Sequence, residues 1–272
     1  MIMIYKHSVK TKIVCLITVL CLFISLSVSY IQSEAASDKV TVYVVTKITA
    51  SGKWKNDANQ KAVKESKKFE YSYNKNGLVD TSSESEKHSD YESYITSKCF
   101  YKGKYIVKGN VSSDITQSGK NTSSKMTITY SRNKNNVLTK MTYKENGKKS
   151  TDKFKIKRNS KKQITFVSCK NSDFKINNYS SYEYDSKERI SKYNDAEIKY
   201  DSHGYAKSVG SDKIKNSYKS GRLTKRVLTS EFRTQTYKIQ YKKISIPKKY
   251  KDAVERQQRY IIEYEYDIPW YY

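Results

Sequence analysis

The sequence predicts an all-β protein, a curved antiparallel meander of β-hairpins that ends in one helix. Three observations support this fold class. Apolar and polar residues alternate with a period of two along most of the chain. Short polar turns interrupt this alternation. Residues 181–225 contain three imperfect copies of one hairpin-length unit, and such a repeat determines architecture more strongly than any single motif.

The chain divides into three parts. Residues 1–36 have the layout of a secretory signal peptide, because lysines precede the apolar run 13–28 and small residues follow it. A retained membrane anchor is the alternative, although this run is shorter than the roughly 20 residues that a spanning helix needs. Residues 37–246 are expected to form the β-hairpin repeat domain. Residues 247–272 are expected to form a C-terminal helix and an aromatic tail.

The first strand and the first hairpin have the clearest patterns. Val40, Val42 and Val44 alternate with Thr41 and Tyr43, which is typical of a half-buried strand. Residues 69–73 alternate in the same way and run into the sequence Asn-Lys-Asn-Gly at 74–77. An Asn-Gly pair between two alternating runs is a strong hairpin signal, so a turn is expected there.

The arrangement of strand, polar turn and strand recurs through the rest of the domain. In the second half of the chain the repeated positions are about 13 to 18 residues apart, which leaves room for two strands of ordinary length per unit. Tyrosines or their substitutes lie before the turns at positions 73, 130, 143, 156, 184, 200 and 218. We therefore expect hairpins throughout, with bends that include 185–189 and 201–204.

The last strand and the C-terminal helix differ in period. Residues 237–242 alternate between apolar and basic side chains, as in a strand with one aromatic face and one basic face. Pro247 then ends the alternation, and proline is favoured at the first position of a helix. Tyr250, Val254 and Ile261 recur at helical spacing, so a helix is expected over 247–260. Its expected role is to cover an open edge or end of the sheet.

Residues 182–223 carry a unit that resembles the YD repeat of bacterial RHS and wall-associated proteins, written Y-x-Y-D-x-x-G-R-L. The first copy matches at Tyr182, Tyr184, Asp185, Arg189 and Ile190, with Glu188 at the glycine position. The second copy matches at Tyr200, Asp201 and Gly204, with Tyr205 in place of arginine, and the third keeps Gly221, Arg222 and Leu223. The layout is also similar to that of small exported proteins of Gram-positive gut bacteria, which carry an "IPKKY…QQ" segment like residues 246–258. This resemblance implies a hairpin-repeat architecture and no particular activity.

The charge of the chain indicates which partners it attracts. Lysine and arginine total 53 against 27 acidic residues, so the formal net charge is +26. Such a field attracts polyanions, and it does so less as the salt concentration rises. For an exported protein the expected partner is an anionic cell-wall polymer or a glycan, with a membrane surface as a further possibility and nucleic acid not expected. The expected location is extracellular and associated with the cell wall.

Residues that could support catalysis or bind a metal are few. His88 and His203 are the only histidines after residue 36, so no metal site, no cofactor and no catalytic residue is predicted. Asp185 and Asp201 are interpreted as turn formers. Cys99 and Cys169 are disulfide candidates in an oxidising exterior, with two buried thiols as the equal alternative.

The tyrosines give the positive indication of function. The chain has 26 tyrosines against 7 phenylalanines, which favours half-exposed rings whose hydroxyls need partners. One interpretation makes these rings packing residues of a thin sheet. The other is that tyrosine beside lysine or arginine stacks on sugar rings while the cations hold anions. The candidate ligand-binding residues are then Tyr182, Tyr184, Tyr200, Tyr218, Tyr237, Tyr241, Arg189 and Arg222.

Together these features predict a non-enzymatic, secreted or cell-surface binding protein for an anionic wall polymer or glycan. One alternative is a carrier that holds a lipid or another apolar ligand in a bent β-sheet. A second alternative is a secreted hydrolase or toxin.

Overall fold

The computed structural model describes residues 38–55, 61–172 and 177–263. The predicted signal peptide at 1–36 and the predicted aromatic tail from residue 264 lie outside these described residues. Within them, no helix is long and apolar enough to span a membrane.

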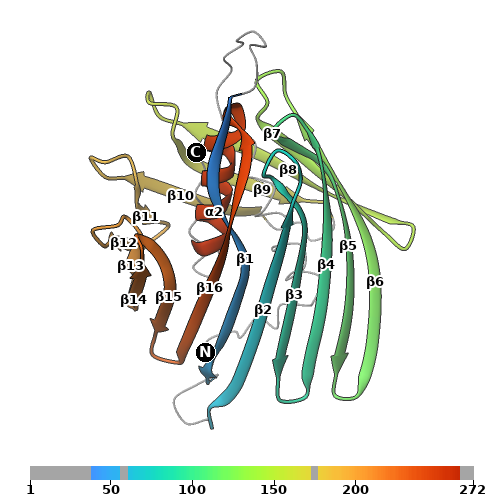
Figure 1. Ribbon diagram of the computed structural model, residues 1–272. Coiled ribbons are helices and arrows are strands. Elements are labelled where there is room, and N and C mark those ends of the chain that lie inside the picture. Colours follow the sequence, from blue (N-terminus) through green and yellow to red (C-terminus); the bar gives the residue numbers. More distant parts are fainter. Residues whose placement is uncertain (1–37, 56–60, 173–176, 264–272) are drawn as a thin grey trace.

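The strands form one closed antiparallel barrel in which each strand pairs with its neighbours in the sequence (Figure 1). The strands are β1 (Lys39–Trp54), β2 (Val63–Tyr73), β3 (Val79–His88), β4 (Tyr91–Lys102), β5 (Tyr105–Gln117), β6 (Lys120–Arg132), β7 (Leu138–Glu145), β8 (Lys148–Arg158), β9 (Ile164–Asn171), β10 (Asn177–Tyr184), β11 (Ile190–Tyr193), β12 (Ala196–Tyr200), β13 (Ala206–Val209), β14 (Asp212–Lys219), β15 (Arg222–Thr229) and β16 (Arg233–Pro247). The predicted all-β meander of hairpins is confirmed.

The predicted curved meander closes on itself, so it is a barrel and not a curved sheet. β1 pairs with β16 from Lys39↔Pro247 to Trp54↔Arg233, so the first and last strands share a ladder along their whole length. Closure gives both terminal strands a hydrogen-bonded neighbour, which removes the edges that an open sheet would leave unpaired. The C-terminal helix is expected to cover an open edge or end of the sheet. Because β1 and β16 pair with each other, they leave no open edge for it to cover.

Several hairpin turns are built on one asparagine or aspartate. Asp201 Oδ1 accepts hydrogen bonds from the backbone N–H groups of His203 (2.9 Å) and Tyr205 (3.0 Å). Asn74 and Asp185 make the equivalent pairs of bonds in their own turns. The bends predicted at 74–77, 185–189 and 201–204 are thus present, because a short acceptor side chain satisfies the amides that the turn leaves free.

One residue of each of these turns has a left-handed backbone. Gly77 and Gly204 have φ angles of 79° and 78°. Glu188, which stands where the repeat pattern expects glycine, has a φ of 62°. The turn geometry is therefore kept in the copy that lacks glycine, at the steric cost that a Cβ brings in this region.

β-Bulges interrupt the ladders near the end of the barrel where these turns lie. The register shifts at Ser72/Tyr73, Phe100/Tyr101, Ser131/Arg132, Lys157/Arg158, Glu183/Tyr184, Lys199/Tyr200, Ser217/Tyr218 and Val45/Lys47. A bulge bends its strand and leaves local backbone groups without ladder partners.

The barrel wall has an apolar inner face and a polar outer face. In β4 the side chains of Tyr91, Ile95 and Cys99 are buried, whereas the intervening Glu92 and Lys98 are exposed. Inward side chains of all the strands from β1 to β16 join one hydrophobic cluster. The apolar residues of the alternating pattern therefore point toward the core, and the polar residues point outward.

The chain turns into the barrel after β16. Pro247 precedes a short 3₁₀ helix, Lys248–Tyr250, and helix α2 follows over Lys251–Glu263. The predicted helix is therefore confirmed, with slightly later bounds. The last turn of α2 is buried on every side from Tyr260 to Glu263, because it packs into the hydrophobic cluster within the upper part of the barrel (Figure 1).

Polar side chains of α2 bond to β1 and to strands on either side of the β1–β16 pair. Gln258 and Gln257 accept hydrogen bonds from the backbone N–H groups of Val45 (2.6 Å) and Val79 (2.9 Å). Glu263 also forms an ion pair with Arg226 of β15, two strands away from β1, at 3.1 Å, and both side chains are almost fully buried. The helix is therefore bonded to the inner wall of the barrel near β1 and β16.

Candidate functional site

Two of the tyrosines predicted to bind ligand lie in the core. Tyr182 and Tyr237 are only 3% and 4% exposed, so neither ring is accessible from outside. Tyr182 stacks on Tyr193 with ring centroids 5.5 Å apart, and the Tyr237 hydroxyl donates a hydrogen bond to Gln235.

Three other predicted tyrosines have a structural role at the ends of strands. The hydroxyls of Tyr184, Tyr200 and Tyr241 donate hydrogen bonds to backbone carbonyls on the preceding strand. Their acceptors are the carbonyl oxygens of Ile164 (2.7 Å), Ile190 (2.6 Å) and Leu223 (2.8 Å). Burial raises the pKa of Tyr184 to about 12, so its hydroxyl stays protonated and donating at neutral pH.

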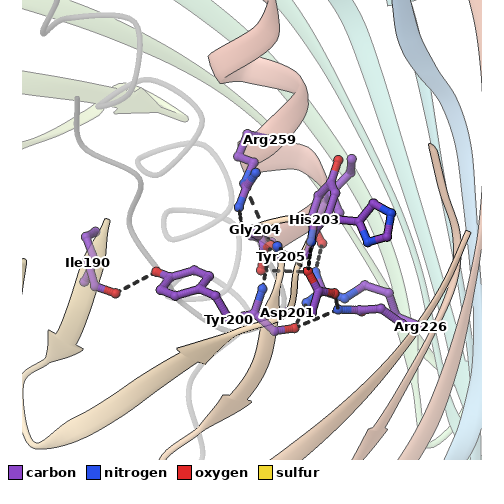
Figure 2. A network of polar contacts seen from close by, with 12 residues as sticks. Ile190, Tyr200, Asp201, His203, Gly204, Tyr205, Arg226 and Arg259 are labelled. Carbon is purple, nitrogen blue, oxygen red and sulfur yellow. Dashed lines mark hydrogen bonds and ion pairs between the residues drawn. The ribbon is translucent and has the colours of Figure 1, made fainter. Parts of the chain in front are cut away.

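Tyr218 belongs to a polar network around Asp201, shown in part in Figure 2. Its hydroxyl donates to the Asp201 carboxylate, and His203 stacks on its ring with centroids 3.9 Å apart. Burial opposes ionisation of Asp201, but the hydrogen bonds from Tyr218 and Asn216 outweigh it and hold the pKa of that carboxyl below its usual value. This network ties the turn between β12 and β13 to β14.

The same turn also contacts the helix. The Arg259 guanidinium of α2 donates to the carbonyl of Gly204 and lies 4.4 Å from the centroid of the Tyr205 ring (Figure 2). Arg226 donates to the carbonyls of Ala206 (3.0 Å) and Ile262 (3.1 Å). These groups hold the helix against the wall.

The two predicted arginines are held by local contacts. Arg189 forms an ion pair with Asp185 at 2.6 Å and lies over the Tyr200 ring at 4.3 Å. Arg222 lies over the ring of Tyr43 at 4.1 Å. The structure does not bring the eight predicted residues together as one accessible face.

The cysteines and histidines do not gather into a site. Cys99 is buried in β4, Cys169 is half-buried in β9, and the two are not bonded to each other. His88 stacks on Tyr91 in the wall, whereas His203 lies in an exposed turn. Among the described residues, no group of three or more histidine, cysteine or acidic side chains could hold a metal ion.

A groove lies on the outer face of the wall, across β2 to β7. Its volume is about 770 Å³. The outward side chains that line it are mainly hydroxyl and amide groups in cross-strand register, such as Ser72↔Thr81, Thr96↔Ser112 and Asn110↔Thr127. Several of these pairs hydrogen-bond to each other. The groove therefore presents rows of polar groups suited to a hydroxylated ligand.

Aromatic and basic side chains surround these polar rows. Tyr94 is 51% exposed at the groove. Lys98, Lys125 and Lys144 also line it, and of these Lys98 is paired with Asp80 at 2.6 Å. Lys125 and Lys144 lie at the side of the groove formed by β6 and β7.

On β7, β8 and β9 many of the outward side chains are lysines. Lys140 of β7 lies directly opposite Lys153 of β8, which lies directly opposite Lys170 of β9. Lys144 is likewise opposite Lys149. We call the outward lysines of β6 to β9 the basic face; they are Lys125, Lys140, Lys144, Lys149, Lys153, Lys155, Lys157 and Lys170.

Among the described residues, the lysines of the central row form no ion pair. Within the part of the chain that the structure describes, no carboxylate lies within 4.0 Å of Lys140, Lys153 or Lys170. Asp152, the adjacent acid, points inward and accepts hydrogen bonds from Tyr143 and Asn171, both at 2.6 Å. Like charges directly opposite each other destabilise a sheet, so this row carries a cost that a bound anion would relieve.

Sequence reasoning did not find the basic face. A signal was available, because Lys153, Lys155 and Lys157 alternate with Phe154 and Ile156 and so share one face of a strand. The alignment of lysines on neighbouring strands was not available, because register is set by pairing between segments far apart in the sequence.

Comparisons with known proteins leave the family open. No protein-family model and no curated protein matches the chain. A porin-like protein from Bacteroides uniformis is 12% identical, with 73% of this chain and 98% of that chain covered and a TM-score of 0.45. MPT-4, a mannose phosphorylase from Leishmania mexicana solved with phosphate ion, is 8% identical, with 78% and 86% covered and a TM-score of 0.22. Both scores are low, so neither similarity supports a statement about the function of this chain.

Proposed function

We propose that the protein is a non-enzymatic, exported binding protein that holds an anionic polymer of the cell wall on its basic face. The row Lys140–Lys153–Lys170 carries this proposal, because three cations in direct register are costly unless an anion lies across them. The net charge of +26 supports it by attracting polyanions from a distance.

The shape of the surface fits a linear ligand. Neighbouring strands are about 4.8 Å apart, so the three ammonium groups of the row follow a line perpendicular to the strands. Lysine binds phosphate and carboxylate groups as a point charge and does not require a fixed orientation of the ligand. A flexible polymer with an anionic group in each unit can therefore contact several lysines at once.

The interior of the barrel gives less support to an apolar-ligand carrier. Val45, Ile128 and Leu138 are fully buried in the same cluster as Tyr260, Ile261 and Ile262 of α2. These inner side chains are thus already covered by other parts of the protein. A hydrolase or toxin, the second alternative, would need a nucleophile and a general base, and Cys169 and His203 are the pair that the sequence offers. Turnover that is lost in both Cys169→Ala and His203→Ala would favour this alternative.

Binding to purified poly(glycerol phosphate) tests the proposal. The triple variant Lys140→Gln/Lys153→Gln/Lys170→Gln should bind about 100-fold more weakly at low salt, since each lysine near an anionic surface contributes about 1 kcal/mol. The dependence of the affinity on salt concentration should also become shallower, because fewer counterions are released.

A matched control separates the effect of the lysine row on binding from the effect of net charge. Lys199→Gln/Lys207→Gln/Lys215→Gln removes the same charge from exposed positions on β12, β13 and β14. This variant should bind within a few-fold of the unmodified protein. Equal losses in both triple variants would show that charge alone, and not the row, holds the polymer.

A further inference from the structure

An aromatic pair lies on the outer face beside the lysine row. Phe166 of β9 and Tyr179 of β10 stack with ring centroids 6.2 Å apart and ring planes inclined by 15°. Tyr179 is 68% exposed, more than Tyr43, Tyr94, Phe100 or Phe232, the other exposed large hydrophobic residues of the described chain. Covering such a ring with a ligand would be favourable, so the pair offers an apolar contact surface on the outer face.

The register places these rings among the lysines. Lys155, Ser168 and Tyr179 form one cross-strand row on the outer face, and Lys157, Phe166 and Ser181 form the next. The row Lys140–Lys153–Lys170 adjoins the row that contains Lys155, on the side away from Lys157. Residues two apart on one face of a strand are separated by about 7 Å, so rings and ammonium groups lie within the reach of one ligand unit.

The nearest cation is already placed over one of the rings. The ammonium nitrogen of Lys157 lies 5.4 Å from the centroid of Phe166. This contact covers part of Phe166 and leaves Tyr179, on the next strand, as the exposed stacking surface.

We infer that the ligand of the basic face is an acidic polysaccharide, whose sugar rings stack on Tyr179, with Phe166 supporting that ring, while its anionic groups contact Lys153, Lys155 and Lys170. This inference rests on the proposed function and narrows its ligand class. A polymer without rings would use the lysines alone and would leave the aromatic pair without a role.

A polysaccharide fits this surface better than a single-stranded nucleic acid does. Nucleic-acid channels supply aromatic side chains on which successive bases stack. The basic face instead offers one aromatic pair, and the groove that adjoins it presents hydroxyl and amide groups in rows. Such groups match the many hydroxyls of a sugar chain.

Binding of three probes to the full protein tests the inference. The probes are polygalacturonate, which has rings and carboxylates, inorganic polyphosphate, which has no rings, and oligo(dT). The variant Phe166→Thr/Tyr179→Thr should lose about tenfold or more in affinity for polygalacturonate and should bind polyphosphate within twofold of the unmodified protein. Threonine is chosen because it suits an outward position of a strand.

A control variant removes two other exposed aromatic residues. Tyr43 and Phe100 also lie beneath a cation, at 4.1 Å from Arg222 and 5.5 Å from Lys108, but outside the lysine rows. Tyr43→Thr/Phe100→Thr should therefore bind both polymers normally. Near-ultraviolet circular dichroism of each variant verifies that the barrel is folded.

The other outcomes distinguish the two proposals. Unchanged polygalacturonate binding in Phe166→Thr/Tyr179→Thr would overturn the inference, as would tighter binding of oligo(dT) than of polygalacturonate. Binding of polyphosphate without binding of polygalacturonate would overturn the inference and leave the proposed function standing. Failure of the unmodified protein to bind any of the polyanions would overturn the proposed function itself.

Discussion

The hydroxyl of Tyr200 donates a 2.6 Å hydrogen bond to the carbonyl oxygen of Ile190 (Figure 2). β11 and β12 pair only at Lys192 and Tyr193, so the Ile190 carbonyl lies beyond their ladder. The tyrosine hydroxyl takes the place of the missing amide. Tyr101 makes the same contact with Val79 (2.8 Å), which explains why the repeats end in tyrosine where phenylalanine would supply the ring alone.

This contact predicts a specific loss of stability. Tyr200→Phe should lower the free energy of unfolding by about 1 kcal/mol, because it keeps the ring and leaves the Ile190 carbonyl without its donor. Urea denaturation followed by fluorescence measures the change. Tyr94→Phe is the control, since Tyr94 is half-exposed on the outer face, and it should change the free energy of unfolding very little. Equal effects of the two substitutions would contradict this role of Tyr200.

The tyrosine hydroxyls also predict how stability depends on alkaline pH. Burial raises the pKa of Tyr184 to about 12, whereas a tyrosine in the unfolded chain titrates near 10. The folded state favours the protonated form, so this contribution is complete below pH 10 and is lost as the pH rises toward 12. Tyr184→Phe should be less stable than the unmodified protein at pH 7 but should lose less stability between pH 10 and 12. Parallel profiles of unfolding free energy against pH would refute the assignment.

The buried ion pair of the helix predicts a larger effect. Glu263→Ala should destabilise the protein by about 3–5 kcal/mol, because it leaves the Arg226 guanidinium buried without its counter-charge. The double variant Arg226→Met/Glu263→Met should recover part of this loss. Denaturant unfolding of the unmodified protein and the two variants measures both changes in the free energy of unfolding.

An exposed pair on the same helix provides the control. Lys251 and Glu255 are 3.8 Å apart and about half-exposed, so Glu255→Gln should cost less than about 0.5 kcal/mol. An equally small effect of Glu263→Ala would show that the ion pair does not hold the helix in the barrel.

Gly52 predicts a steric effect at the closure of the barrel. A Cβ on this residue would lie 2.2 Å from the carbonyl oxygen of Thr234 on β16. Gly52→Ala should therefore force β1 and β16 apart and lower the thermal unfolding temperature markedly. Gly103→Ala is the comparison, because a Cβ there meets no atom within 4 Å, although its φ of 61° adds the usual cost of a left-handed backbone. A smaller drop in Gly52→Ala than in Gly103→Ala would contradict this account.

Part of the candidate site was within reach of sequence reasoning. The prediction that tyrosine and lysine lie together on an open sheet face describes Phe166, Tyr179 and the lysines around them better than it describes the tyrosines first chosen. The repeated tyrosines face inward or bond to carbonyls at strand ends, and most of them lie beside a bulge. Tyr179 lies outside the repeated position, so no periodicity marked it.

The sequence by itself determined the hairpins, their turns at residues such as Asn74 and Asp201, and the division of each strand into an inner and an outer face. These features depend on neighbours within a few positions, so a short window of sequence contains the information. The tertiary structure alone decided that β1 meets β16, that α2 lies within the barrel, and that Lys140, Lys153 and Lys170 stand in one row. Those outcomes depend on register and packing between distant segments, whose energies arise only when the strands are brought together.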